Sequence, residues 1–343
     1  MKIGINGLGR IGRLTLRAAI ERGISVAAIN TSSNLEQLAY LLQYDSTHGK
    51  ANFQIEVGDS CLRIQGEEIA VFSQDIASQE VASKKDTQQT PWQQLGIDLV
   101  LECSGKFNKK DLAAMHLSGS NSRVIVSAPC DDADATIVFG VNEDILKPSD
   151  QVISIGSCTT NALAPIVKVL HEAFGIESGY ATTIHSYTFD QNLLDNFHHD
   201  PRRARCATTS MIPTKSGITK ALKLVLPKVG DRISGSAIRV PVPNVSLIDF
   251  SFKSASMVDV FTVNEAVSRA VEGKMGRILS VAQDRLVSID FNHNPYSSIF
   301  DPFETQVVGG DFIRVLCWYD NEWAFVNRML DVSILLNNLA AFE

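Results

Sequence analysis

Residues 2–12 read KIGINGLGRIG, and this stretch decides the fold of the amino-terminal part of the chain. Residues 2–6 are a short apolar run typical of a buried strand, and residues 10–22 carry apolar side chains at helical spacing. The stretch contains three glycines in the pattern GxGxxG, which are Gly7, Gly9 and Gly12. The first permits a tight turn, the second lets the backbone approach a pyrophosphate, and the third allows the helix to pack closely on the strand. We therefore expect a dinucleotide-binding turn here.

A second apolar run, residues 26–29, completes a strand–helix–strand unit within about thirty residues. Dinucleotide-binding folds that use NAD place an acidic residue at the end of this second strand, where it holds the ribose 2′-hydroxyl. Residues 28–34 read AINTSSN and contain no Asp or Glu. Hydroxyl groups here could donate to a 2′-phosphate, so Asn30 and Thr31 leave the use of NADP open. The alternative is that these residues only cap the next helix.

Alternating strand and helix patterns continue through the first half of the chain. Further strand candidates are residues 61–64, 99–103, 123–127 and 151–155. This alternation predicts a parallel sheet with helices on its faces, which is a Rossmann fold of the α/β class. Residues 77–90 are polar and predict a surface insertion.

The pattern changes near residue 158. A helix pattern follows at residues 162–174, and β-rich runs lie at residues 179–184, 236–242, 246–253 and 286–290. Residues 187–216 look irregular, and a loop that long inside a compact domain is usually functional. The apolar helical pattern at residues 322–339 would pack back onto the first domain. With 343 residues the chain is long enough for two domains.

Composition excludes several classes of function. The net charge of -7 gives no basic field for nucleic acid, and no apolar run approaches the roughly 20 residues that cross a membrane. No secretory leader pattern is visible at the amino terminus. The six cysteines are scattered without a CxxC pair, so we expect neither a metal site nor a disulfide framework. A soluble protein of the reducing cytoplasm is the expectation.

Cys158 lies between a strand pattern and an apolar helix pattern. A thiol at the amino terminus of a helix feels the helix dipole, which lowers its pKa and favours thiolate. His185 ends the next strand pattern, and either an antiparallel or a crossover strand could bring it back to the cysteine. Such a pair would hold a thiolate beside an imidazolium and supply a general acid and base. A lone cysteine is otherwise more often a small buried apolar residue.

The chain resembles the glyceraldehyde-3-phosphate dehydrogenase family along nearly its whole length. The matching segments occur in the family's order, at residues 6–13 (NGLGRIGR), 44–49 (YDSTHG), 157–161 (SCTTN), 163–165 (LAP), 190–192 (DQN), 202–205 (RRAR), 239–241 (RVP), 243–245 (PNV) and 318–322 (WYDNE). The resemblance implies a Rossmann domain at residues 1–157, completed by a carboxy-terminal helix at about 318–343. It also implies an α+β catalytic domain at residues 158–317 with a mixed or antiparallel sheet.

The resemblance also implies roles for individual residues. Cys158 would be the nucleophile and His185 its base, while Asn321 would hold the nicotinamide carboxamide. The substrate phosphate and the inorganic phosphate would be bound by Thr188, Arg203, Arg239, Ser157, Thr159, Ser216 and Gly217. The cofactor would be bound by Gly7, Gly9, Arg10, Ile11, Gly12, Asn30, Thr31 and Ser127. Residues 187–216 would match a loop that packs near a neighbouring subunit's cofactor, in a homotetramer.

By this resemblance, the function is that of a phosphorylating glyceraldehyde-3-phosphate dehydrogenase of glycolysis or gluconeogenesis. It would oxidise a small phosphorylated aldehyde through a cysteine thioester, with inorganic phosphate, to 1,3-bisphosphoglycerate. Thr31 stands where NAD-using members have Asp, so the cofactor is NAD or NADP. Two alternatives stay open. One is erythrose-4-phosphate dehydrogenase, which residues 287–295, Pro91-Trp92 and Glu322-Trp323 resemble. The other is a catalytically idle NADP-binding regulatory protein.

Overall fold

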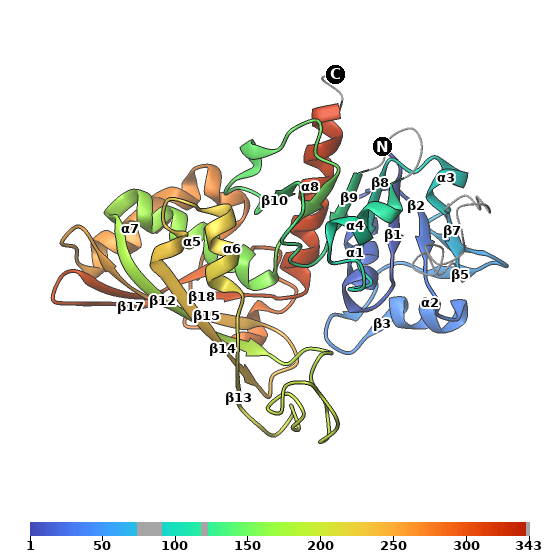
Figure 1. Ribbon diagram of the computed structural model, residues 1–343. Helices are drawn as coiled ribbons and strands as arrows, with labels where there is room; N and C mark the ends of the chain where they lie inside the picture. The colour runs from blue at the N-terminus through green and yellow to red at the C-terminus, as the bar shows by residue number, and fades with distance from the viewer. Residues whose placement is uncertain (74–90, 118–122, 341–343) are drawn as a thin grey trace. The chain divides into compact units, whose positions relative to one another are not determined.

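The computed structural model describes residues 1–73, 91–117 and 123–340 (Figure 1). The chain forms two compact units. The first comprises Met1–Ile137, Asp144–Gly156 and Val326–Glu343, and the second comprises Val138–Glu143 and Ser157–Phe325. The surface insertion that we predicted at residues 77–90 lies outside the described residues.

The first unit is built on a mostly parallel sheet. Within the described residues, its strands follow the order β10-β11-β9-β8-β1-β2-β7-β6-β5. The parallel strands are β1 (Ile3–Asn6), β2 (Val26–Asn30), β7 (Glu67–Phe72), β8 (Leu99–Glu102), β9 (Arg123–Val126), β10 (Ala135–Thr136) and β11 (Val152–Ser154). Two antiparallel strands, β5 (Ile55–Val57) and β6 (Cys61–Ile64), extend one edge. The chain order reverses between β1 and β8, and nucleotides bind at the carboxyl ends of strands at such a switch point.

Helices accompany the parallel strands, as the apolar spacing predicted. Among the described residues, the α-helices of the first unit are α1 (Arg10–Glu21), α2 (Leu35–Gln43), α3 (Pro91–Leu95), α4 (Lys110–Ala113) and, from Val326 onward, α8 (Trp323–Ala340). A small hairpin of β3 (Tyr44–Asp45) and β4 (Gly49–Lys50) follows α2. The apolar face of α1, including Leu14 and Leu16, is buried. Asn34 caps α2 by accepting a hydrogen bond from the backbone N–H of Gln37 at 3.0 Å, so one residue of the 28–34 segment does act as a helix cap.

The second unit carries a mixed sheet with helices on one face. In the described part of the chain its order is β13-β14-β12-β15-β18-β17-β16. The strands are β12 (Ile176–Ser186), β13 (Ile212–Thr214), β14 (Ile233–Val240), β15 (Ser246–Ser254), β16 (Leu279–Val281), β17 (Ser298–Val308) and β18 (Phe312–Tyr319). Strand β12 is parallel to β14 and antiparallel to β15. Helix α5 (Cys158–Phe174) packs on the sheet between α6 (Ile218–Val225) and α7 (Val260–Glu272) (Figure 1). The predicted fold class, a Rossmann domain plus a domain with a mixed sheet, is confirmed.

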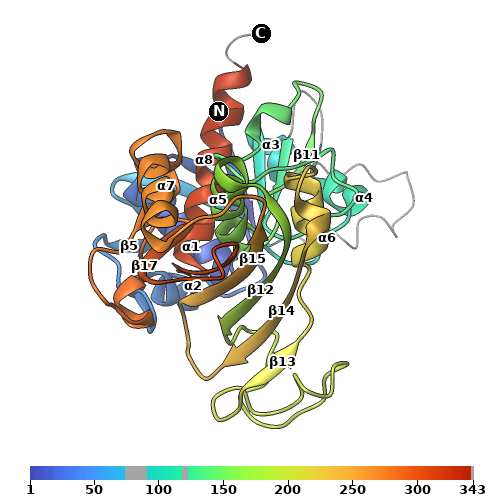
Figure 2. The same cartoon turned by 90° about the vertical axis from the view of Figure 1, so that its left-hand side faces the viewer.

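Two details differ from the prediction. Residues 286–290 do not form a strand, because Ser288–Phe291 is a 3₁₀ helix in which Asp290 accepts a hydrogen bond from the backbone N–H of Val287 at 2.9 Å. The segment at residues 187–216, which we predicted to be irregular, contains the short strand β13 (Ile212–Thr214). Figure 2 shows the loop before this strand projecting past it. The last helix, α8, begins at Trp323, whose backbone N–H donates a hydrogen bond to the carboxylate of Asp320 at 2.8 Å.

Candidate active site

Cys158 is the first residue of α5 in the second unit. The helix begins there because the Ser157 side chain caps it, with Oγ accepting the backbone N–H of Thr160 at 3.1 Å. Gly156 precedes the cap with a φ of 64°, a left-handed backbone that favours glycine and turns the chain into the helix. The thiol is therefore held at a helix amino terminus, and its residue is partly exposed.

The predicted cysteine–histidine pair is brought together. His185 lies near the end of β12, and its Nε2 is 3.5 Å from Sγ of Cys158. Strand β12 lies in the mixed sheet between β14 and β15. His185 pairs with Arg239 of β14, and the residue before it, Ile184, is the last to pair with β15, so the backbone that carries the histidine is held by the sheet. Both residues belong to the second unit.

A buried tyrosine holds the two elements that carry this pair. The hydroxyl of Tyr319 is 3.1 Å from Oγ1 of Thr159 on α5 and 2.8 Å from Oγ1 of Thr183 on β12. Its ring meets the ring of His185 edge-on, with centroids 5.9 Å apart. Burial raises the pKa of the phenol, which is therefore neutral at physiological pH. Sequence analysis did not select Tyr319, although it lies in the WYDNE segment.

The electrostatics contradict the expected thiolate–imidazolium pair. Burial, reinforced by the positive charge of Arg239, lowers the pKa of His185 from 6.5 to about 3. Burial also raises the pKa of the Cys158 thiol, and the opposing attraction of Arg239 does not cancel this effect. Both groups are therefore neutral at pH 7 in this structure. Our prediction of a lowered thiol pKa was wrong because removal of the sulfur from water outweighs the favourable charges around it.

Arg239 faces the ring nitrogen of His185 that points away from the sulfur. It pairs with His185 in the β12–β14 register, and its Nη1 is 2.6 Å from Nδ1 of His185 and 2.8 Å from the carbonyl oxygen of Ser186. That carbonyl oxygen lies 2.7 Å from the same Nδ1. A guanidinium can only donate and a carbonyl oxygen can only accept, so Nδ1 either accepts from Arg239, with the imidazole proton on Nε2 facing the sulfur, or carries the proton and donates it to Ser186. The Nε of Arg239 is buried and has no hydrogen-bond partner among the described residues. Such an unpaired donor suits an anion.

Four of the other residues predicted to bind phosphate lie in two places. Ser157 and Thr159 flank the nucleophile on α5, whereas Thr188 and Arg203 lie in the segment after β12. Arg203 donates to Oγ1 of Thr214 at 3.0 Å and forms an ion pair with Asp190. Burial disfavours the charged form of Asp190, but the hydrogen bond and charge of Arg203 outweigh it and lower the pKa of that carboxyl. Arg203 therefore has a carboxylate partner with which an incoming phosphate must compete.

Three further predicted residues lie beside secondary-structure ends of the second unit. Ser216 and Gly217 immediately precede α6, with Gly217 at its N-cap position. Asn321 follows β18, and its Oδ1 accepts hydrogen bonds from Oγ of Ser186 at 2.9 Å and of Ser246 at 2.8 Å. These two bonds fix the orientation of the amide, so its Nδ2 group is the donor end.

The glycine loop of the first unit has the geometry of a dinucleotide-binding turn. Gly7 has a φ of 85°, and a Cβ there would lie 2.5 Å from the backbone of Ser104. A Cβ on Gly12 would lie 1.9 Å from the carbonyl oxygen of Gly7, whereas a Cβ on Gly9 would meet nothing within 4 Å. The first and third glycines therefore serve packing, and the second leaves open space of the kind a pyrophosphate needs. These residues fit an NAD(P) cofactor.

The remaining residues of the predicted cofactor site lie at strand ends or on α1 of the first unit. Arg10, next to Ile11 in the first turn of α1, donates to Asp45 at 2.5 Å. Asn30 ends β2 and Thr31 follows it, and both are buried. Oγ1 of Thr31 accepts a hydrogen bond from the backbone N–H of Ser33 at 3.2 Å. Ser127 follows β9 at the same, carboxyl-terminal side of the sheet.

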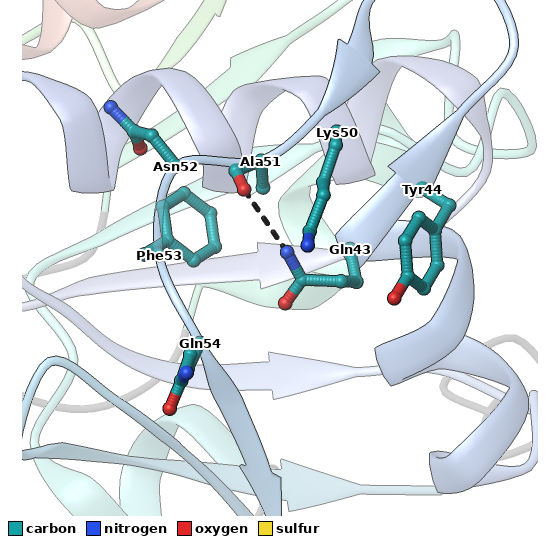
Figure 3. A pocket seen from close by; sticks show the side chains of 7 residues that line it. All are labelled: Gln43, Tyr44, Lys50, Ala51, Asn52, Phe53 and Gln54. Atoms are coloured by element: carbon teal, nitrogen blue, oxygen red, sulfur yellow. Dashed lines mark hydrogen bonds between the residues drawn. The ribbon is translucent and has the colours of Figure 1, made fainter.

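A separate pocket of about 450 Å³ lies near the β3–β4 hairpin of the first unit. Figure 3 shows the amide of Gln43 donating to the carbonyl oxygen of Ala51, at 3.1 Å, with the side chains of Tyr44 and Lys50 alongside. None of the predicted site residues lines this pocket.

Within residues 1–73, 91–117 and 123–340 no group of three or more His, Cys, Asp or Glu could hold a metal ion. The six cysteines are all free thiols. None of the helices in the described part of the chain is long and apolar enough to cross a membrane.

A glycine turn of dinucleotide-binding type in one unit and a cysteine–histidine pair in the other define the class of dinucleotide-dependent oxidoreductases. Comparison with known proteins agrees. Residues 1–110 match the family description "Glyceraldehyde 3-phosphate dehydrogenase, NAD binding domain", and residues 157–321 match "Glyceraldehyde 3-phosphate dehydrogenase, C-terminal domain". The chain belongs to the glyceraldehyde-3-phosphate dehydrogenase family.

Its relatives match over almost their whole length. The chain is 48% identical over 341 residues to the chromosomal glyceraldehyde-3-phosphate dehydrogenase of Cupriavidus necator, with 98% of each chain covered. It is 45% identical over 342 residues to the glyceraldehyde-3-phosphate dehydrogenase of Cereibacter sphaeroides, with 99% of each covered. It is 44% identical over 335 residues to that of Geobacillus stearothermophilus, with 97% of each covered.

Proposed function

We propose that this protein is a phosphorylating glyceraldehyde-3-phosphate dehydrogenase of glycolysis or gluconeogenesis that works through a thioester on Cys158. The single observation that carries the proposal is the 3.5 Å approach of His185 Nε2 to the Cys158 sulfur at the start of α5. Names of relatives at 44–48% identity over nearly the whole chain support the same activity. The product would be 1,3-bisphosphoglycerate.

The first chemical step needs a free lone pair on Nε2. With Arg239 donating to Nδ1, the proton lies on Nε2 and the imidazole cannot accept another there. A substrate phosphate offers Arg239 a stronger acceptor, because a guanidinium–phosphate contact is charge-assisted. Released from Arg239, Nδ1 can keep the proton and donate it to the carbonyl oxygen of Ser186, which is 2.7 Å away. The lone pair of Nε2 then faces the thiol.

The sulfur next bonds to the aldehyde carbon as its proton passes to Nε2 and then to the carbonyl oxygen, which gives a hemithioacetal. The backbone N–H of Cys158 can donate to that oxygen. A bound nicotinamide supplies the acceptor for the hydride that leaves the same carbon. Nε2 takes the hydroxyl proton, and a thioester on Cys158 remains. An oxygen of inorganic phosphate then attacks the thioester carbon, the C–S bond breaks, the departing sulfur takes back the proton held on Nε2, and the acyl phosphate leaves.

We assign the binding groups by residue. Thr188, Arg203 and Arg239 would hold the phosphate of the substrate, and the second phosphate would be held by Ser157, Thr159, Ser216 and Gly217. NAD or NADP would be held by the glycine turn with Arg10, Ile11, Asn30, Thr31 and Ser127, and by Asn321 through its Nδ2 donor. On this proposal residues 1–157 with 318–343 bind the cofactor and residues 158–317 catalyse.

A homotetramer of the cytoplasm is part of the proposal. The segment after β12 exposes large apolar side chains, with Phe189 98% and Phe197 100% exposed. Leu193, Leu194 and Met211 of the same segment are exposed as well. Apolar surface of this extent is characteristic of a protein–protein contact, and a second copy of the chain is the partner that the family resemblance implies.

The test is steady-state kinetics with glyceraldehyde 3-phosphate and erythrose 4-phosphate, each with NAD and NADP and with or without inorganic phosphate. We expect phosphate-dependent turnover of glyceraldehyde 3-phosphate. Phosphate-independent oxidation of erythrose 4-phosphate would support the sister enzyme instead. Cys158→Ser should abolish turnover while NADH binding persists, and near-normal turnover of that variant would refute the assignment. If no aldehyde is oxidised and the wild-type thiol resists iodoacetamide, the idle NADP-binding alternative holds.

A further inference from the structure

A buried carboxylate lies beneath the glycine turn of the first unit. Glu102 is the last residue of β8, next to β1 in the sheet, and only 1% of its surface is exposed. Burial of an ionised carboxylate costs several kcal/mol unless hydrogen bonds satisfy its oxygens. The hydrogen bonds that Glu102 accepts therefore indicate what this carboxylate does in the structure.

One oxygen of Glu102 holds the loop that supports Gly7. Oε1 accepts the backbone N–H of Ser104 at 2.6 Å and the Ser104 hydroxyl at 2.5 Å. The backbone of Ser104 is the surface against which Gly7 packs, since a Cβ on Gly7 would lie 2.5 Å from it. The position of Ser104 therefore sets the position of the first glycine of the turn.

The other oxygen of Glu102 holds the ends of two neighbouring strands. Oε2 accepts Nδ2 of Asn6, the last residue of β1, at 2.6 Å. Oδ1 of Asn6 in turn accepts Nδ2 of Asn30, the last residue of β2, at 2.9 Å. The backbone carbonyl of Asn30 accepts the N–H of Gly7 at 2.9 Å. The end of β2, where the ribose would bind, and the glycine turn, where the pyrophosphate would bind, are thus linked through the carboxylate of Glu102.

A histidine and a tryptophan complete the network. Nε1 of Trp92 is 3.0 Å from Nδ1 of His116, and Nε2 of His116 is 2.8 Å from Oε2 of Glu102. An indole N–H can only donate, so Nδ1 accepts and the proton of His116 lies on Nε2, where it points to Glu102. The four groups around the carboxylate can all donate to it. His116 itself has no exposed surface.

We propose that Glu102 is a positioning residue for the dinucleotide, which holds the glycine turn and the end of β2 in the geometry that binds the adenosine and pyrophosphate parts of the cofactor. The inference rests on cofactor binding at the glycine turn and not on the chemistry of Cys158. It predicts that damage to the network weakens the cofactor without changing the reaction of the bound complex.

The experiment measures dissociation constants of ADP-ribose by calorimetry and of NADH by fluorescence, in the full-length protein. Glu102→Gln replaces one carboxylate oxygen, which accepts hydrogen bonds, by an NH₂ group that would face donors. We expect the dissociation constants of both ligands to rise by the same factor, about tenfold. Values of kcat at saturating NAD and the rate of Cys158 alkylation should stay within about twofold of wild type. Glu68→Gln, which changes an exposed carboxylate on β7 of the same sheet, is the matched control and should change neither constant.

A pair of variants at His116 keeps the test decisive if Glu102→Gln does not fold. His116→Gln can still accept from Trp92 and donate to Glu102, so it should bind both ligands like the wild type. His116→Leu removes the donor and should weaken both about equally. Dissociation constants within twofold of wild type in a folded Glu102→Gln or His116→Leu protein would overturn the proposal. So would a loss of kcat at unchanged affinity. An inactive wild type whose variants still follow this binding pattern would sink the proposed function alone.

Discussion

The charge of Arg239 should control the basicity of His185, and Arg239→Gln tests this directly. Nη1 of Arg239 lies 2.6 Å from Nδ1 of His185, so the guanidinium charge and an imidazolium charge would be about 4 Å apart. At an effective dielectric constant of about 20, that repulsion amounts to about 4 kcal/mol, or almost three pKa units. Burial, the larger cause of the low pKa, persists in the variant. Because burial is the larger cause, the contribution of Arg239 lies below this Coulomb value, and we expect the pKa of His185 to rise by roughly one to two units from about 3 and to stay below 6.5.

The assay is an NMR titration of protein labelled with ¹³C-histidine, with the His185 signal assigned by its loss in His185→Gln. Arg239→Lys, which keeps a cation at the position, is the matched control and should leave most of the shift in place. Added sulfate should pair with Arg239 and so shift the pKa of His185 in the same direction as Arg239→Gln. The reasoning fails if His185 of the wild type titrates near pH 6.5, or if its midpoint is unchanged or lower in Arg239→Gln.

Three further predictions concern the turn, the cofactor and acid stability. Gly12→Ala should lower the melting temperature strongly because its Cβ would overlap the carbonyl oxygen of Gly7. Gly9→Ala should melt like the wild type but bind NADH more weakly, because its Cβ would enter the open space of the turn. Equal melting temperatures of the two variants would contradict this. Thr31→Asp should lower the ratio of kcat/KM for NADP to that for NAD at least tenfold, since a carboxylate repels the 2′-phosphate; an unchanged ratio would place the ribose elsewhere. The pKa of His185 is lower in the folded protein than in the unfolded chain. As the pH falls below 6.5 the unfolded chain therefore binds a proton at this residue before the folded protein does. The stability that His185 contributes above pH 6.5 is lost between pH 6.5 and pH 3, and the loss is about 3 kcal/mol at pH 4. Urea denaturation at pH 7 and pH 4 should show a smaller loss for His185→Gln than for the wild type.

Local patterns carried most of the fold prediction. The GxGxxG turn, the buried strand before it and the helix after it are short-range features, because strand burial and glycine geometry are visible within a dozen residues. The prediction of a strand at residues 286–290 was wrong. The apolar residues there suit a strand, but the carboxylate of Asp290 accepts a hydrogen bond from the backbone N–H of Val287 and closes a turn. Strand β18 was absent from the predicted strands, although its sequence, FIRVLCWY, has strong β-sheet propensity.

The site was only partly predictable, for a different reason. Cys158 and His185 could be selected because the chemistry of each residue and its place at the end of a predicted element pointed to the pair. The Tyr319 hydroxyl contacts two threonines that each lie more than a hundred positions before it in the chain, and no local pattern reports such a contact. The charge states also depend on burial, which is a tertiary property: the helix dipole argument was sound for an exposed thiol and failed for this one.

The phenol of Tyr319 has a consequence for how the sulfur can change its bonding. Because that hydroxyl spans Thr159 and Thr183, the distance between helix α5 and strand β12 is maintained by neutral groups that take no part in proton transfer. The sulfur can pass through thiol, hemithioacetal and thioester states without the two elements relying on the sulfur–imidazole contact for their alignment. Each catalytic cycle then starts from the same spacing, whatever is attached to Cys158.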